Sequence, residues 1–147
     1  NNHHSYGVNR RIFENFISEN FENHHIIRLP GLFGKGLKKN IIFDFLTNNE
    51  IQKIDSRNVF QFYNLSDLSN DIKTTISHNV SIINFSTEPI SVEEVYRSLF
   101  NKSYKNITSN TIINYNIKSI YYQIFNGENG YLKNKKHILN QLRSFNL

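Results

Sequence analysis

The sequence contains no cysteine, methionine, tryptophan or alanine. Without cysteine the chain forms no disulfide bond and no thiolate metal site, which is typical of a reducing compartment, so we expect a cytoplasmic protein. Because the sequence has no methionine, we expect that residue 1 is not the translated start and that the 147 residues are a processed fragment or part of a longer protein. The first residues also lack the apolar segment of a signal peptide.

Long apolar runs and blocks of like charge are absent too. No run approaches the ~18 apolar residues of a membrane span, so no membrane partner is expected. The net charge of +5 is spread along the chain, whereas a nucleic-acid surface gathers basic and aromatic groups on one face, so no nucleic-acid partner is expected. With 38% hydrophobic and 20% charged residues, residues 1–147 are predicted to fold as one unit.

Apolar spacing predicts alternating helices and strands, and hence an α/β fold with some parallel strands. Helices are predicted at 7–21, 37–49, 64–76, 92–101, 117–125 and 134–145. Strands are predicted at 24–31, 59–63 and 80–86. The three glycines of residues 31–36 predict a turn or a ligand-facing loop, and residues 103–116 are polar and left unassigned. Asn64 or Ser66 and the capping box of Ser91 and Glu94 mark helix starts.

The first predicted helix carries the main candidate chemistry. Its apolar residues recur at three- and four-residue spacing and predict one buried stripe of Ile12, Phe13, Phe16, Ile17 and Phe21. Tyr6 and Arg10 lie about one turn apart on one face. A cation beside a tyrosine favours the phenolate and makes the residue a better acid or base at neutral pH. The spacing alone also fits a helix-start tyrosine beside a solvated arginine.

Several segments resemble one family in the correct order. "YGVNRRIFE" resembles the Tyr-Gly-x-x-Lys-x-x-x-Glu segment of the extended short-chain dehydrogenases/reductases, the NAD-dependent epimerase/dehydratase family, with Arg10 at the lysine position and Glu14 at the acidic position. The segments that follow, "IIRLPGLFGKG", "VFQFYNLSDLSNDI" and "IINFSTEPISVEEV", resemble later segments of that family. The ending from Asn126 resembles the C-terminal part of small sugar-epimerase-like members, so the resemblance covers nearly the whole chain.

The resemblance implies the C-terminal part of a Rossmann-type fold with its small substrate-binding subdomain, and a dinucleotide-binding half outside residues 1–147. It implies that Tyr6 is the acid/base and Arg10 the partner of the nicotinamide ribose, with NAD or NADP as cofactor. It places cofactor contacts at Leu29, Pro30 and Gly31, and substrate contacts at Leu32, Phe33, Lys38 and Lys39. The implied substrate is a sugar or sugar nucleotide, and a homodimer is one assembly that the resemblance allows.

Other readings stay open. Arginine has a different shape from lysine and does not relay protons, which favours a non-catalytic relative that binds a ligand or partner without redox chemistry. A small independent α/β interaction module is a further alternative. No metal site is predicted, because His3 and His4, like His24 and His25, are adjacent residues that point to opposite faces of a strand.

Overall fold

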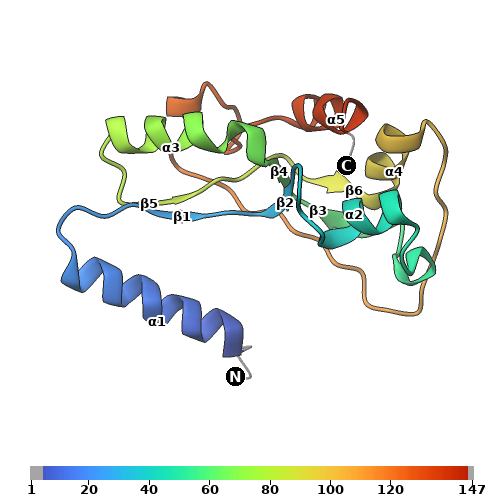
Figure 1. Ribbon diagram of the computed structural model, residues 1–147, viewed down its shortest axis with the longest axis horizontal. Coiled ribbons are helices and arrows are strands. Elements are labelled where there is room, and N and C mark those ends of the chain that lie inside the picture. Colours follow the sequence, from blue (N-terminus) through green and yellow to red (C-terminus); the bar gives the residue numbers. More distant parts are fainter. Residues whose placement is uncertain (1–4, 146–147) are drawn as a thin grey trace.

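The computed structural model describes residues 5–145, and these residues form an α/β arrangement in which helices flank pairs of short strands (Figure 1). The helices are α1 (Ser5–Asn20), α2 (Asn40–Thr47), α3 (Leu68–Ser77), α4 (Val92–Phe100) and α5 (Lys135–Arg143). The strands are β1 (Ile26–Arg28), β2 (Gly31–Phe33), β3 (Val59–Phe60), β4 (Phe62–Asn64), β5 (Ile82–Asn84) and β6 (Ile90–Ser91). Short 3-10 turns occupy Ile51–Lys53, Leu65–Asp67 and Tyr122–Phe125.

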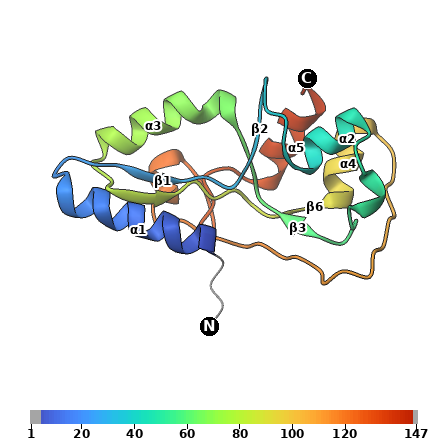
Figure 2. The same cartoon turned by 60° about the horizontal axis from the view of Figure 1, so that its bottom comes forward.

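The strands pair two by two. β1 is parallel to β5 and β2 is parallel to β4, whereas β3 is antiparallel to β6. The two parallel pairs confirm the expected α/β fold with some parallel strands. Helices α3 and α1 lie on opposite sides of the β1–β5 pair, while α2, α4 and α5 gather at the other end of the molecule (Figures 1 and 2).

Gln61 explains why the predicted strand 59–63 is divided into β3 and β4. The residue is buried, with an exposed fraction of 3%, and its side chain bonds backbone groups of two other segments. Its amide nitrogen donates to the carbonyl oxygens of Thr87 (2.5 Å) and Ile117 (2.7 Å), and its amide oxygen accepts from the N–H of Ile117 (2.8 Å). The chain passes at this residue from an antiparallel pair to a parallel one.

Two hydrophobic cores meet at β4. Successive side chains of a strand point to opposite faces, so Phe62 enters one core and Tyr63 the other. The first core joins α2, α4 and α5 and contains Phe33, Ile42, Phe45, Phe62, Ile90, Val92, Val95, Ile138 and Leu142. The second lies around β5 and contains Tyr63, Val80, Ile83, Phe85, Phe125 and Leu132.

Helix ends follow local signals. The capping box predicted at Ser91 and Glu94 is present at the start of α4, and the Asn64 side chain accepts from the N–H of Ser66 at the start of the turn before α3. Asn48 and Asn101 end α2 and α4 in the left-handed conformation, with φ of 54° in both. Asparagine tolerates this conformation better than most residues with side chains.

Several predicted elements need correction. Residues 31–33, expected within a turn or loop, form strand β2, because they pair in parallel register with Phe62–Asn64. The helix predicted at 117–125 is a short 3-10 turn at Tyr122–Phe125. Ile76, an apolar residue at the end of the helix predicted at 64–76, is 52% exposed. Residues 103–116 follow an extended path along the surface (Figure 2).

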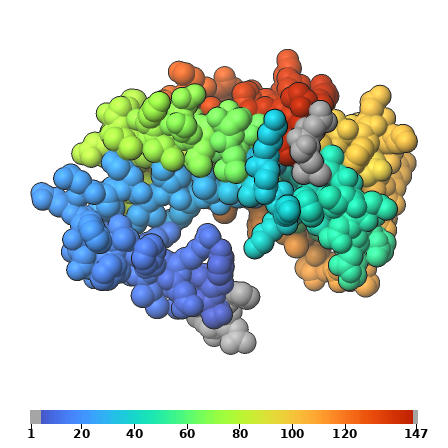
Figure 3. Space-filling model, in the orientation of Figure 1, coloured from blue at the N-terminus to red at the C-terminus, as the bar shows by residue number. Residues whose placement is uncertain are grey.

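The buried stripe predicted for α1 is also wrong. None of its 16 residues is buried, and Ile12, Phe13, Phe16 and the following Phe21 are between 52% and 65% exposed. The space-filling view shows α1 as a separate ridge below β1 (Figure 3). Helical spacing identifies which side is apolar, but burial needs a second surface, and residues 5–145 do not cover these four side chains.

Candidate functional site

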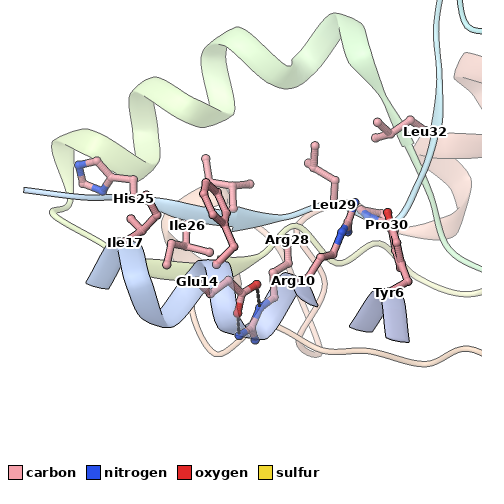
Figure 4. Close-up of a pocket in the computed structure, with 12 residues that line it drawn as sticks. Tyr6, Arg10, Glu14, Ile17, His25, Ile26, Arg28, Leu29, Pro30 and Leu32 are labelled. Carbon is pink, nitrogen blue, oxygen red and sulfur yellow. Dashed lines mark hydrogen bonds and ion pairs between the residues drawn. The ribbon is translucent and has the colours of Figure 1, made fainter. Parts of the chain in front are cut away.

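The main cavity within residues 5–145 lies between α1 and the segment that contains β1. It has a volume of about 650 Å³. One wall is a face of α1, and the other runs along β1 and the residues after it (Figure 4). The lining residues are Tyr6, Arg10, Phe13, Glu14, Ile17, His25, Ile26, Ile27, Arg28, Leu29, Pro30 and Leu32.

Tyr6 and Arg10 form a stacked pair at the mouth of this cavity. The guanidinium carbon of Arg10 lies 4.5 Å from the centre of the Tyr6 ring. Figure 4 shows both side chains pointing from α1 towards Leu29 and Pro30, which follow the carboxyl end of β1. A cation over an aromatic ring contributes ~0.5–1 kcal/mol at an exposed site, enough to favour one mutual orientation. The face predicted from the spacing therefore exists and opens into the cavity.

Glu14 and Arg28 connect α1 to β1 beside this pair. The Arg28 Nε atom donates to Glu14 Oε1 at 2.9 Å, and Arg28 Nη2 donates to Oε2 at 2.5 Å. These hydrogen bonds hold the pKa of Glu14 below its ordinary value and raise that of Arg28. The paired geometry orients the helix relative to the strand, although an ion pair this exposed contributes only ~0.2–1 kcal/mol to folding.

The residues predicted to contact cofactor or substrate divide into two groups. Tyr6, Arg10, Leu29, Pro30 and Leu32 all line the cavity. The remaining four lie elsewhere: Gly31, Phe33, Lys38 and Lys39. The roles assigned to both groups stay predictions.

Each member of the second group has a structural setting of its own. The Gly31 N–H donates to the carbonyl oxygen of Gln61 at 3.1 Å as β2 begins. Phe33 is 2% exposed and packs edge-to-face on Phe145, with ring centres 5.6 Å apart. Lys38 and Lys39 are exposed just before α2 and do not line the cavity.

Seven cavity residues were not predicted as site residues, and three of them have ionisable side chains: Glu14, His25 and Arg28. Glu14 and Arg28 lie inside the segments that resemble the dehydrogenase family, and this resemblance is the signal that points to them. His25 carried no such signal; its Nδ1 is hydrogen-bonded to the carbonyl oxygen of Val80 at 2.7 Å. His3 and His4 lie outside the described residues. Within residues 5–145, no cluster of three or more histidine, aspartate or glutamate residues is placed to hold a metal ion.

The donor groups of the cavity fit one end of a dinucleotide. A phenol, a guanidinium and the apolar segment at Leu29 and Pro30 suit a ribose and a flat ring. A pyrophosphate requires a turn with the Gly-x-Gly-x-x-Gly spacing between a strand and a helix N-terminus. The turn between β2 and α2 contains Gly34 and Gly36 without that spacing, and neither glycine lines the cavity. These residues therefore fit the nicotinamide end and not the phosphates.

Parallel strands with helices on both sides, and a polar pair beyond the carboxyl end of β1, define a Rossmann-type α/β fold. Neither a protein-family profile nor a curated protein sequence matches the chain. A solved structure does match: dTDP-glucose 4,6-dehydratase from Bacillus anthracis, determined in complex with NAD. The TM-score is 0.57 at 17% sequence identity, over 80% of this chain and 42% of that chain.

At this identity the similarity concerns the fold. It confirms the predicted class, an α/β fold corresponding to part of a Rossmann-type fold. The chain spans about 42% of the length of the dehydratase that it matches. No helix within residues 5–145 is long and apolar enough to cross a bilayer.

Proposed function

We propose that this chain is the C-terminal, substrate-binding portion of an NAD(P)-dependent epimerase, dehydratase or reductase acting on a sugar or sugar nucleotide. One observation carries the proposal: Tyr6 and Arg10 face the carboxyl end of β1 across an open cavity. Ligands of open α/β sheets bind outside the carboxyl ends of the strands. The structural similarity to a dehydratase determined with NAD supports the same class of reaction.

In this proposal Tyr6 exchanges a proton between its hydroxyl and a hydroxyl of the substrate. Tyr6 is 59% exposed, so a substrate in the cavity reaches the side chain. Arg10 holds the ring of Tyr6 from one side and donates hydrogen bonds to ribose hydroxyls with its remaining N–H groups. The bound cofactor supplies the acceptor or donor of hydride.

The proposal includes a separate dinucleotide-binding portion that packs against α1 and β1. β1 pairs with β5 along one edge, and the Ile27 backbone faces the other edge. Parallel strands are normally covered on both faces and belong to larger sheets. The exposed apolar side chains of α1 are suited to such a layer, because burying each of Ile12, Phe13 and Phe16 contributes ~1.5–3 kcal/mol.

A second candidate function rests on Arg10. Lysine and arginine are not interchangeable where a compact ammonium takes part in proton transfer. The stacking of the Arg10 guanidinium on Tyr6 is a suitable packing role for arginine even without chemistry. A non-catalytic protein that binds a nucleotide or partner with the same fold is therefore the alternative.

The experiment uses the product of the complete gene. Calorimetric titration with NADH and NADPH is expected to show saturable binding, and its absence favours the non-catalytic alternative. With a panel of sugar nucleotides that includes dTDP-glucose, Tyr6→Phe is expected to lower turnover by ~10²–10⁴-fold, because only the acid/base hydroxyl is removed. The matched control is Tyr121→Phe, which removes a hydroxyl outside the cavity lining. Unchanged turnover in Tyr6→Phe excludes Tyr6 from the proposed role.

A further inference from the structure

Asparagine directly precedes glycine at two places in the sequence, and both lie in one surface loop. Asn126–Gly127 and Asn129–Gly130 are separated only by Glu128. Both asparagines are exposed and left-handed, with φ of 55° and 56°. Glycine has no side chain to hinder its own backbone nitrogen, so this nitrogen reaches the side-chain carbonyl of a preceding asparagine more readily than in other residues. The loop therefore contains two candidate sites for the same reaction, deamidation.

The second pair forms a tight hairpin turn. The N–H of Tyr131 donates to the carbonyl oxygen of Glu128 at 2.9 Å, and the N–H of Glu128 donates to the carbonyl oxygen of Tyr131 at 3.0 Å. Asn129 and Gly130 are the two central residues, with φ of 56° and 93°. A two-residue hairpin turn with positive φ at both positions favours the pair Asn-Gly. The turn accounts for the presence of this pair, whereas its reactivity depends on the hydrogen bonds of the glycine nitrogen.

The two glycine nitrogens differ in this respect. The N–H of Gly127 donates to the carbonyl oxygen of Tyr122 at 3.0 Å, and a Cβ atom at Gly127 would lie 2.1 Å from the carbonyl oxygen of Tyr131. Within residues 5–145, the N–H of Gly130 has no hydrogen-bond partner. Gly130 is buried, but the atoms nearest to a Cβ built there belong to the flexible side chain of Lys118. Movement of the nitrogen therefore breaks a hydrogen bond at Gly127 and displaces only a side chain at Gly130.

We propose that Asn129 is a site of spontaneous deamidation and that the fold protects Asn126 from the same reaction. The Gly130 nitrogen attacks Cγ of Asn129, so that an N–Cγ bond forms and the Cγ–Nδ2 bond breaks. The amide leaves as ammonia and takes up the proton that the Gly130 nitrogen loses. Water then opens the five-membered imide at either carbonyl. Opening at Cγ gives aspartate, and opening at the main-chain carbonyl gives isoaspartate, in which the backbone runs through Cγ. Both products carry a new negative charge.

Isoaspartate also lengthens the backbone by one methylene group beside a buried contact. The carbonyl oxygen of Gly130 accepts from the N–H of Ser119 at 2.8 Å and from the hydroxyl of Ser86 at 2.9 Å. Ser86 and Ser119 are 3% and 4% exposed. A longer backbone before Gly130 displaces this carbonyl, and a buried donor that loses its acceptor destabilises the fold. The isoaspartate form is therefore expected to unfold at a lower temperature than the parent.

The test follows both asparagines in one peptide. The folded protein is incubated at about 37 °C and about pH 8 and then cleaved with trypsin after Lys118 and Lys133. The peptide 119–133 contains Asn126 and Asn129 and no other asparagine, so tandem mass spectrometry assigns the modification to one side of Glu128 or the other. Asn129 is expected to react at least ~5-fold faster than Asn126, which is the effect of one backbone hydrogen bond on the attacking nitrogen.

Two controls separate the fold from the local sequence. Unfolding in guanidinium chloride breaks the hydrogen bond of Gly127 and is expected to make the two rates similar. Asn129→Gln is expected to abolish the fall in melting temperature with incubation time, because the longer side chain closes the ring far more slowly, whereas Asn126→Gln is expected to leave this fall unchanged.

Three results overturn the proposal. The first is that Asn129 does not react, and the second is that Asn126 reacts as fast as Asn129 in the folded protein. The third is the same preference in guanidinium chloride, because the local sequence would then be its cause. A melting temperature that stays constant while isoaspartate accumulates contradicts the expected effect on the contacts with Ser86 and Ser119.

Discussion

Replacing Tyr63 with phenylalanine tests the buried polar contact of the second core. Tyr63 is fully buried, and its hydroxyl donates to Asp71 Oδ2 on α3 at 2.6 Å. Asp71 is buried, with an exposed fraction of 6%. Its other carboxylate oxygen, Oδ1, lies 3.6 Å from Lys133 Nζ. Tyr63→Phe keeps the ring against Phe85, with ring centres 5.5 Å apart in the parent, and removes only the donor.

The expected loss follows from the charge of the acceptor. A hydrogen bond to a charged group contributes ~1.5–3 kcal/mol, so Tyr63→Phe is expected to lower the free energy of unfolding by about 2 kcal/mol at pH 7. For a chain of this length, that loss lowers the melting temperature by about 4–8 °C. Urea and thermal unfolding followed by circular dichroism measure both quantities.

The same contact predicts an alkaline dependence. Burial, and then the hydrogen bond to Asp71, raise the pKa of Tyr63 far above its ordinary value of 10.0. The unfolded chain therefore loses this proton near pH 10 while the folded chain keeps it, so stability is present below pH 10 and falls as the pH rises. The advantage of the parent over Tyr63→Phe is expected to shrink by about 1.4 kcal/mol per pH unit above 10.

The control is Tyr131→Phe. In the parent the Tyr131 hydroxyl donates to Oδ1 of the exposed Asn116 at 2.6 Å. This change is expected to cost under ~1 kcal/mol, because water replaces the lost partner. Two results refute the reasoning. Equal stability of Tyr63→Phe and the parent at pH 7 means that the bond contributes nothing, and a difference that stays constant from pH 8 to pH 11.5 contradicts the raised pKa of Tyr63.

Two further predictions concern charged contacts. The hydrogen bonds from Arg57 hold the pKa of Asp55 below its ordinary value of 3.8, so its contribution to stability is present above about pH 4 and lost as the pH falls. Asp55→Asn is expected to flatten the acid-unfolding curve measured by circular dichroism, and an unchanged curve contradicts this role. Glu14→Gln is expected to weaken the contact with Arg28 and so to speed amide hydrogen exchange in α1. Glu19→Gln, an exposed position on the same helix, is the control and is expected to leave the exchange rates unchanged.

Predictions from neighbouring residues succeeded best. The capping box of Ser91 and Glu94 and the cap at Asn64 depend on contacts within four residues, so the local sequence is sufficient to specify them. The end of the helix predicted at 37–49 is equally local, because Asn48 adopts the left-handed conformation that asparagine tolerates at such a position. The parallel strand pairs followed from the alternation of helices and strands along the chain.

Elements that depend on distant partners were predicted less well. Strand β2 was expected as a turn or loop because Gly31 and two further glycines lie within six residues. Its strand conformation results from pairing with β4, about 30 residues further along the chain. A Cβ atom at Gly31 would lie 3.1 Å from the Gln61 carbonyl oxygen, so this glycine permits a close approach of two backbones.

The candidate site shows the same division. Helical spacing was enough to place Tyr6 and Arg10 on one face of α1. Spacing does not tell which residues lie opposite that face. In the tertiary structure, Leu29 and Pro30 line the same cavity as Tyr6 and Arg10. Phe33 is adjacent in sequence to Leu32, yet it points into the core because successive strand residues alternate.

Helices α1 and α5 show what sequence alone determines. Both carry apolar residues one turn apart, Ile12 and Phe16 in α1 and Ile138 and Leu142 in α5. This spacing was enough to predict each helix and its apolar side. The tertiary structure decided the rest: Ile138 and Leu142 are fully buried against α4 and its neighbours, whereas Ile12 is 61% and Phe16 52% exposed. Periodicity is a property of one segment, but burial requires a second surface brought near by the rest of the fold.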